Sequence, residues 1–121
     1  MFCARDPLGV RPFHYAYAQG VFVFASSARA VAVAGPGGPT LNRARVADFL
    51  AGLEAIDETS TFYRDVQRLP RGHTAVWSDQ GFDIRRYWQP EAGPELVLAS
   101  DDDYLDAFAE RYETAVADRM A

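Results

Sequence analysis

Short apolar runs separated by turn-forming residues dominate the first ninety residues of the chain. Apolar and aromatic side chains fill most of positions 13–18 and 21–25, and only Gln19 and Gly20 separate the two runs. Two residues of this kind between apolar runs predict a tight β-hairpin. Because successive residues in both runs are apolar, rather than alternate ones, we expect both faces of this hairpin to be covered.

Other parts of the chain also have the pattern of strands and turns. Residues 1–4 form an apolar run, expected to be a buried strand, which stops at an Asp-Pro-Leu-Gly turn that ends at Gly9. A positive φ is expected for this glycine. Residues 73–77 and 82–88 are predicted to pair as a second hairpin, and 66–72, with its Pro and Gly, is predicted to form a turn.

Residues with oxygen-bearing side chains mark the starts of two short helices. Ser26 and Ser27 precede the Ala-rich run 28–34, and Asn42 precedes a segment with apolar residues at helical spacing. Such side chains accept hydrogen bonds from the free N–H groups of a first helical turn. The residues expected on one face of the second helix are Val46, Phe49, Leu50 and Leu53.

The last helix is predicted to begin after Ser100. Three aspartates at 101–103 occupy its first turn, where carboxylates complement the positive end of the helix dipole. The residues that recur at helical spacing, and that we expect to form its buried face, are Leu105, Phe108, Tyr112 and Val116.

The charge of the chain changes abruptly near residue 90. Residues 1–90 carry 10 Arg and 8 acidic residues, whereas 91–121 carry 2 Arg and 9 acidic residues. The change coincides with a stretch at 89–94 that contains two prolines and a glycine. Such stretches are typical of boundaries between structural units, so we predict one unit over 1–90 and a second over 91–121.

Composition narrows the class of protein. The chain has 121 residues, 49% of them hydrophobic, which suits one small domain or a piece of a larger one and excludes a disordered tail. No unbroken apolar run is longer than five residues, so we expect no membrane helix, and no secretory signal is visible. A net charge of −5 argues against nucleic acid as a partner. We therefore expect a cytoplasmic protein that binds neither membranes nor nucleic acids.

The side chains that most often carry chemistry are few and scattered. Cys3 is the only cysteine, which excludes an intramolecular disulfide, and its apolar neighbours favour a packed core residue over a nucleophile. His14 and His73 are the only histidines, too few for a zinc site without further thiols. The serines at 26–27 and the aspartates at 101–103 are explained by helix capping. From these residues we predict no catalytic, cofactor-binding or metal site.

Several short motifs follow one another along the chain. The stretch 2–16 resembles the RDxxGxxP region of class II glutamine amidotransferase domains. Further segments similar to this family lie at 21–31, 41–50, 61–73 and 86–88. The Arg-Leu-Pro-Arg-Gly-His run at 68–73 and the Arg-Tyr-Trp at 86–88 favour the branch of glutamine-dependent asparagine synthetases, and 104–120 is similar to the helix that begins their ATP-dependent half.

This resemblance implies an α+β fold. The expected architecture over residues 1–90 is the second half of the N-terminal-nucleophile (αββα) glutaminase domain, with antiparallel sheets and flanking helices. Residues 91–121 would be the linker and the first helix of the ATP-dependent synthetase domain. Strand edges left unpaired in such a half-domain invite self-association, which leaves a homodimer open.

The implied parent activity is asparagine biosynthesis by an ATP-dependent, glutamine-hydrolysing ligase. Glutamine, aspartate and ATP would be its substrates, magnesium would accompany ATP, and asparagine, glutamate, AMP and pyrophosphate would be its products. The family's amino-terminal cysteine, its glutamine-binding residues and its Ser-Gly-Gly-x-Asp-Ser ATP loop have no counterpart among the 121 residues. We therefore expect a fragment that is inactive alone and binds no cofactor.

The residues that match the family motifs are expected to act as scaffold. These are Arg5, Asp6, Gly9, Pro12, Ser26, Arg68, Leu69, Pro70, Gly72, His73, Tyr87 and Trp88. Two alternatives stay open for the function. One is an amide- or macrolactam-forming cyclase on the same scaffold, which is consistent with Ser27 in place of the family's usual Glu. The other is a non-catalytic half-domain that pairs with a partner chain.

Overall fold

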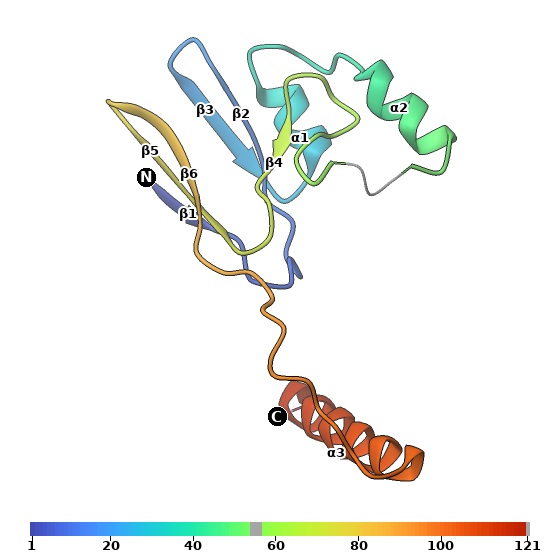
Figure 1. Cartoon of the computed structure of the whole chain (residues 1–121). Coiled ribbons are helices and arrows are strands. Elements are labelled where there is room, and N and C mark those ends of the chain that lie inside the picture. The colour runs from blue at the N-terminus through green and yellow to red at the C-terminus, as the bar shows by residue number, and fades with distance from the viewer. Residues whose placement is uncertain (54–56, 121) are drawn as a thin grey trace. The chain divides into compact units, whose positions relative to one another are not determined.

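A computed structural model describes residues 1–53 and 57–120 of the chain (Figure 1). The chain divides into two compact units, Met1–Gln89 and Pro90–Ala121, and each is described by itself. The sequence of residues 56–65 predicts irregular structure, and residue 56 lies outside the described residues. The assignment of the two units to a glutaminase half and a synthetase helix stays a prediction.

The described residues of the first unit form two antiparallel three-stranded sheets and two helices, which confirms the α+β prediction. One sheet has the order β1-β5-β6 and the other the order β3-β2-β4. The strands are β1 (Phe2–Ala4), β2 (His14–Ala18), β3 (Val21–Ala25), β4 (Gln67–Arg68), β5 (His73–Ser78) and β6 (Gly81–Arg86). Both predicted hairpins are present as β2–β3 and β5–β6. The short strand β4 lies in a segment predicted only as a turn.

The β3-β2-β4 sheet is covered on both faces, because its residues alternate between two apolar environments. On one face Ala16 packs with Val31 and Ala32 of helix α1 (Ala28–Ala34), in a buried cluster. On the other face Tyr15 packs against the β1-β5-β6 sheet, together with Phe22 of β3. The successive apolar residues of this hairpin therefore serve two neighbouring layers, as predicted.

Aromatic rings fill the space between the two sheets. The ring centroid of Phe82 lies 4.9 Å from that of Tyr15 and 5.3 Å from that of Phe22. Trp77 stacks on Phe22 with their ring centroids 6.0 Å apart. Tyr15 is buried in the same cluster as Leu69. Rings at these spacings contribute about 0.5–1.5 kcal/mol per pair beyond the area that they bury, so this aromatic layer joins the sheets.

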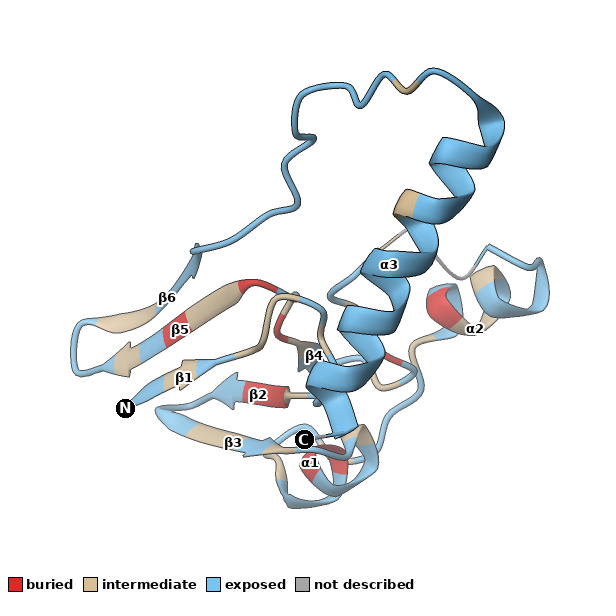
Figure 2. Ribbon diagram, turned by 90° about the horizontal axis from the view of Figure 1, so that it is seen from below, coloured by how far each residue is buried: buried red, intermediate tan, exposed pale blue. Residues whose placement is uncertain are grey.

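The coverage of the first hairpin is incomplete towards its tip, where the prediction was wrong. Tyr17 is 46% exposed and Val21 is 50% exposed, and the tip of the β2–β3 hairpin is coloured as exposed in Figure 2. Here β3 is the edge of its sheet, and β4 pairs only with the other end of β2, at His14 and Tyr15. The tip of the hairpin therefore has fewer neighbours than its base.

The expectation that residues 1–4 form a buried strand was also wrong. β1 forms, but it is an edge strand, and Phe2 is 67% exposed. Its side chains alternate, so only Cys3 points to the apolar cluster between the sheets. A strand of three residues at the edge of a sheet can bury one face at most.

The predicted caps of the first two helices are confirmed. Ser27 Oγ accepts a hydrogen bond from Ala30 N at 3.4 Å, and Asn42 Oδ1 accepts one from Arg45 N at 3.3 Å. Helix α2 is Arg43–Leu50. Of the apolar residues predicted on one of its faces, Leu50 is 78% exposed, so this face is largely open in the described structure.

The second unit contains helix α3, Asp101–Met120. Ser100 Oγ accepts a hydrogen bond from Asp103 N at 3.3 Å, as expected of a helix cap, and donates to Asp103 Oδ2 at 2.8 Å. The prediction of a buried face was wrong, since no residue of α3 is buried (Figure 2). The rest of the described second unit contains no helix or strand that could cover this face; the apolar residues concerned are Leu105, Phe108, Tyr112 and Val116.

Leu69→Ala is expected to lower the free energy of unfolding by about 2–5 kcal/mol, because the side chain is fully buried between the sheets and its removal leaves a cavity. The matched control is Leu50→Ala, whose side chain is 78% exposed and should cost no more than about 0.5 kcal/mol. Urea unfolding followed by circular dichroism measures both values. Similar losses in the two variants would contradict the assigned core.

Candidate functional site

The loop after β1 is organised around the Asp6 carboxylate. Oδ1 accepts hydrogen bonds from the N–H groups of Leu8 (3.1 Å) and Val10 (3.0 Å), and Oδ2 accepts one from Arg11 N (3.2 Å). These donors stabilise the ionised carboxylate and hold the pKa of Asp6 below its usual range, with the bond from Val10 as the largest cause. One side chain therefore shapes the loop.

The Arg5 guanidinium joins this loop to a segment that lies 64 positions further along the chain. Nη1 donates to the carbonyl oxygen of Leu69 at 2.7 Å, Nη2 to that of Gly9 at 3.1 Å, and Nε to that of Arg11 at 3.3 Å. The Arg5 N–H also donates to the His73 carbonyl at 2.9 Å. The planar fork of arginine suits several acceptors at once, which a lysine ammonium does less well.

Gly9 lies where the loop passes close to this guanidinium. Its φ is 69°, which confirms the positive value predicted from the turn sequence. A Cβ at this position would lie only 2.8 Å from Nη2 of Arg5. Glycine is therefore required both by the backbone conformation and by the close approach of the side chain that holds the loop.

A second glycine, Gly72, is hydrogen-bonded to the residues that follow β6. The Gly72 carbonyl accepts hydrogen bonds from Tyr87 N (2.8 Å) and Trp88 N (3.1 Å), while Gly72 N donates to the Asp6 carbonyl (3.1 Å). Its φ is 66°, and a Cβ there would lie 2.5 Å from the Trp88 carbonyl oxygen. The Tyr87 hydroxyl also donates to the Arg5 carbonyl at 3.0 Å. The start of the first unit is thus tied to its end.

We call this meeting point the Arg5 junction, formed by residues 5–11, 69–73 and 87–88. It brings together most of the residues predicted from the family motifs: Arg5, Asp6, Gly9, Leu69, Pro70, Gly72, His73, Tyr87 and Trp88. Pro12 follows the loop directly, whereas Ser26 and Arg68 lie outside it. The side-chain hydrogen bonds of Arg5 and Asp6 in this junction end on backbone groups. The junction is therefore suited to holding segments together rather than to transferring protons.

Cys3 is half-buried and packs against the cluster of Tyr15, Leu69 and Ala75. Burial raises the pKa of its thiol. Because the thiolate is the nucleophilic form, this environment makes Cys3 less reactive at neutral pH. The predicted packing role fits these contacts.

The two histidines are each bonded to the backbone. The His14 ring is buried, and its Nδ1 lies 3.1 Å from the Ser26 carbonyl oxygen. Burial is the largest cause that lowers the pKa of His14, so the neutral ring is favoured. Nδ1 of His73 lies 2.8 Å from the Arg71 carbonyl oxygen. Among the described residues, neither histidine ring is hydrogen-bonded to Cys3.

Within the described residues, no group of three or more His, Cys, Asp or Glu side chains could hold a metal ion. Asp103 is instead engaged with Ser100 at the start of α3. The described residues therefore do not fit the magnesium that the resemblance implies.

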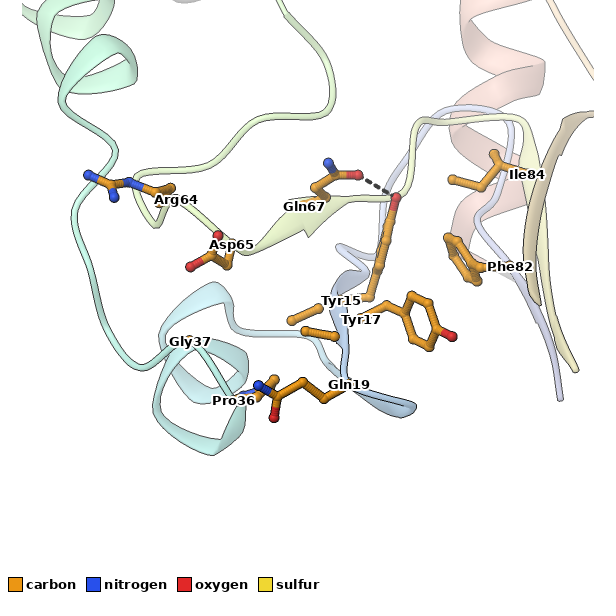
Figure 3. A pocket seen from close by; sticks show the side chains of 12 residues that line it. Tyr15, Tyr17, Gln19, Pro36, Gly37, Arg64, Asp65, Gln67, Phe82 and Ile84 are labelled. Carbon is orange, nitrogen blue, oxygen red and sulfur yellow. Dashed lines mark hydrogen bonds between the residues drawn. The ribbon is translucent and has the colours of Figure 1, made fainter. Parts of the chain in front are cut away.

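A cavity of about 740 Å³ lies beside β2 (Figure 3). Phe82 and Ile84 of β6 form one wall and face Tyr15 and Tyr17. The Tyr15 hydroxyl donates to Gln67 Oε1 at 2.8 Å, and burial raises the pKa of this phenol. The remaining lining residues are Ala16, Ala18, Gln19, Pro36, Gly37, Arg64 and Asp65.

The sequence did not predict this cavity, because its lining comes from four separate parts of the chain. The aromatic run at 13–18 predicted a strand but not which side chains would remain accessible. The pairing of Tyr15 with Gln67 depends on β4, whose two residues were not predicted as a strand. Only the assembled sheets place these side chains around one space.

The model of the glutamine amidotransferase domain family matches residues 1–88, which is most of the chain. The chain belongs to this family. As a glutamine amidotransferase domain it resembles asparagine synthetase [glutamine-hydrolyzing] 3 of Bacillus subtilis (strain 168), with 24% identity over 120 residues. That alignment covers 99% of this chain and 19% of the relative. The chain therefore spans about a fifth of the length of the relative that it matches.

The two antiparallel sheets with their helices are consistent with part of a glutamine amidotransferase domain. The Arg5 junction and the cavity both lie within the matched residues 1–88. Over the described ranges 1–53 and 57–120, no helix is long and apolar enough to cross a membrane.

Gly9→Ala is expected to destabilise the chain more than Gly20→Ala. Both glycines have positive φ values, 69° and 77°, so each substitution costs about 1–2 kcal/mol from the backbone alone. At Gly9 the new methyl group would also displace the Arg5 guanidinium, whereas nothing lies within 4 Å of the methyl group at Gly20. Urea unfolding of the two variants measures the difference. Equal losses would show that the Arg5 contact contributes nothing.

The stability of the chain is expected to fall as the pH decreases from 6.5, the ordinary histidine pKa, to about 5. His14 resists protonation when folded, whereas the unfolded chain binds the proton at the ordinary pKa, so protons favour unfolding. The stabilisation is complete above 6.5 and is lost as the pH falls. The midpoint of thermal unfolding should fall with decreasing pH in the parent chain and in His73→Gln. An equal fall in His14→Gln would contradict the assignment to His14.

Proposed function

We propose that this chain is the scaffold half of the glutaminase domain, and the start of the synthetase domain, of a glutamine-hydrolysing asparagine synthase. The observation that carries the proposal is the extent of the alignment. The family match ends at residue 88, whereas the similarity to the Bacillus subtilis asparagine synthetase extends over 120 residues. It therefore includes the linker and helix α3, which belong to no part of the matched glutamine amidotransferase domain.

The proposed parent reaction converts ATP, aspartate and glutamine into asparagine, glutamate, AMP and pyrophosphate. In this reaction the residues described here would bind no substrate. The Arg5 junction would hold the two ends of the half-domain together, since Tyr87 and Trp88 are bonded to Gly72 immediately before the linker. The scaffold would thus define where the chain leaves the glutaminase domain.

The proposal is tested on the protein made from the complete open reading frame that contains these 121 residues. Formation of AMP and pyrophosphate is measured with glutamine and ATP, with and without aspartate, and asparagine is detected by mass spectrometry. Aspartate-dependent AMP formation together with asparagine would support the proposal. AMP formation that requires a peptide carboxylate instead would identify a cyclase, and no turnover with any carboxylate would favour a non-catalytic domain; either result would overturn it.

The 121-residue chain alone is expected to release no ammonia from glutamine above the uncatalysed background. Its one thiol, Cys3, is half-buried with a raised pKa, and no described residue is hydrogen-bonded to it as a base. Ammonia and glutamate are measured enzymatically for the parent chain and for Cys3→Ser, which should give the same background. Turnover that is present in the parent and lost in Cys3→Ser would contradict the expectation.

A further inference from the structure

The side of β2 away from β3 is only partly paired. β3 pairs with all of β2, whereas β4 pairs only with His14 and Tyr15. On the β4 side, Leu69 N donates to the Phe13 carbonyl at 2.9 Å. Because the backbone groups of a strand alternate between its two sides, the N–H and C=O of Tyr17 also point to the β4 side. There they lie beyond the last residue pair of the β2–β4 ladder.

β4 is short because the chain before it turns away from the sheet. The Thr61 hydroxyl donates to the Val66 carbonyl at 2.8 Å, and Val66 N donates to the Tyr63 carbonyl at 3.3 Å. The backbone groups of Val66 point away from β2, as those of Arg68 do, so Asp65 is the next residue that could continue the ladder. The ladder ends at Gln67, and no described segment pairs with residues 16–18 on this side.

The cavity of Figure 3 lies beside this unpaired part of β2, and we call it the β2 groove. Its lining includes residues 16–18, the end of β4 at Gln67, and the apolar wall of Phe82 and Ile84. The rings of Tyr17 and Phe82 are 6.4 Å apart, and Ile84 is 37% exposed. The groove therefore combines unpaired backbone groups with an accessible apolar surface.

We propose that the β2 groove binds a short extended segment of another polypeptide, which adds to the β3-β2-β4 sheet as a strand beside residues 16–18. Backbone hydrogen bonds to Tyr17 would supply affinity, as in other cases of strand addition. Alternate side chains of the segment would point towards Phe82 and Ile84, so an uncharged, apolar residue is required there. The inference rests on this geometry and not on the proposed parent reaction.

The boundaries of the β2 groove favour a single free segment over a second copy of this chain. β6 lies on one side, and the loops that contain Pro36 and Asp65 lie on the other. A strand that already belongs to a sheet would have to enter together with its neighbours. This disfavours the edge strands β1, β3 and β6 of a second copy, since each is hydrogen-bonded to another strand.

The test is a titration of the ¹⁵N-labelled 121-residue chain with the peptide acetyl-VTVTV-amide, whose central valine is placed to bond to Tyr17, followed by amide chemical shifts and hydrogen exchange. We expect the largest shifts at residues 16–18 and slower exchange of the Tyr17 amide. The peptide acetyl-VTPTV-amide, which lacks the central donor, should bind much more weakly. No shifts at millimolar peptide, equal binding of both peptides, or shifts confined to β1, β3 or the outer edge of β6 would overturn the proposal.

The control compares substitutions at two residues that are similarly exposed but lie on opposite faces of the β1-β5-β6 sheet. Ile84 (37% exposed) lines the β2 groove, whereas Val76 (41% exposed) does not. Ile84→Arg should weaken binding of acetyl-VTVTV-amide at least about tenfold, a loss of about 1.4 kcal/mol, and Val76→Arg should leave it unchanged. If the spectrum of Ile84→Arg shows an unfolded chain, Ile84→Thr keeps the β-branched shape and should still weaken binding. Equal affinities in the folded variants would overturn the proposal.

Discussion

The Arg5 guanidinium donates hydrogen bonds to carbonyl groups in two parts of the chain that are far apart in the sequence, residues 9–11 and Leu69. Its bonds to Gly9 and Arg11 close the loop after β1, and its bond to Leu69 attaches that loop to the segment between β4 and β5. A charged donor to a carbonyl contributes more than a neutral one, and a partly buried carbonyl left without a donor is costly. Leu69 lies in the connection between β4, which belongs to one sheet, and β5, which belongs to the other. Both sheets therefore depend on the side chain that holds this connection.

The layered arrangement follows from a hairpin that is apolar on both faces. Small residues, Ala16 and Ala32, allow α1 to approach one face of the β3-β2-β4 sheet closely, while the rings of Tyr15 and Phe22 fill the wider space towards the other sheet. Burial of the aromatic side supplies the larger apolar area. The Arg5 junction then holds the two sheets at the end opposite the hairpin tips (Figure 1).

Local features could be predicted from the sequence because neighbouring residues determine them. The hairpin turn at Gln19 and Gly20, the caps at Ser27 and Asn42, and the positive φ of Gly9 all belong to this class. Strand β4 could not be predicted, since two residues carry no periodicity and their pairing with β2 depends on distant contacts. Burial was overestimated for the same reason: an apolar pattern shows that a face can be covered, but not that a neighbour covers it.

The two tryptophans of the chain stand in contrasting surroundings. Trp77 stacks on Phe22 between the sheets, and its indole nitrogen is buried. Trp88 is 37% exposed, and its backbone N–H donates to the Gly72 carbonyl at the end of the first unit. Indole emission shifts to longer wavelength as water gains access to the ring. The chain thus contains two intrinsic optical probes, one for the contact between the sheets and one for the place where the linker begins, and replacing either by phenylalanine separates their signals.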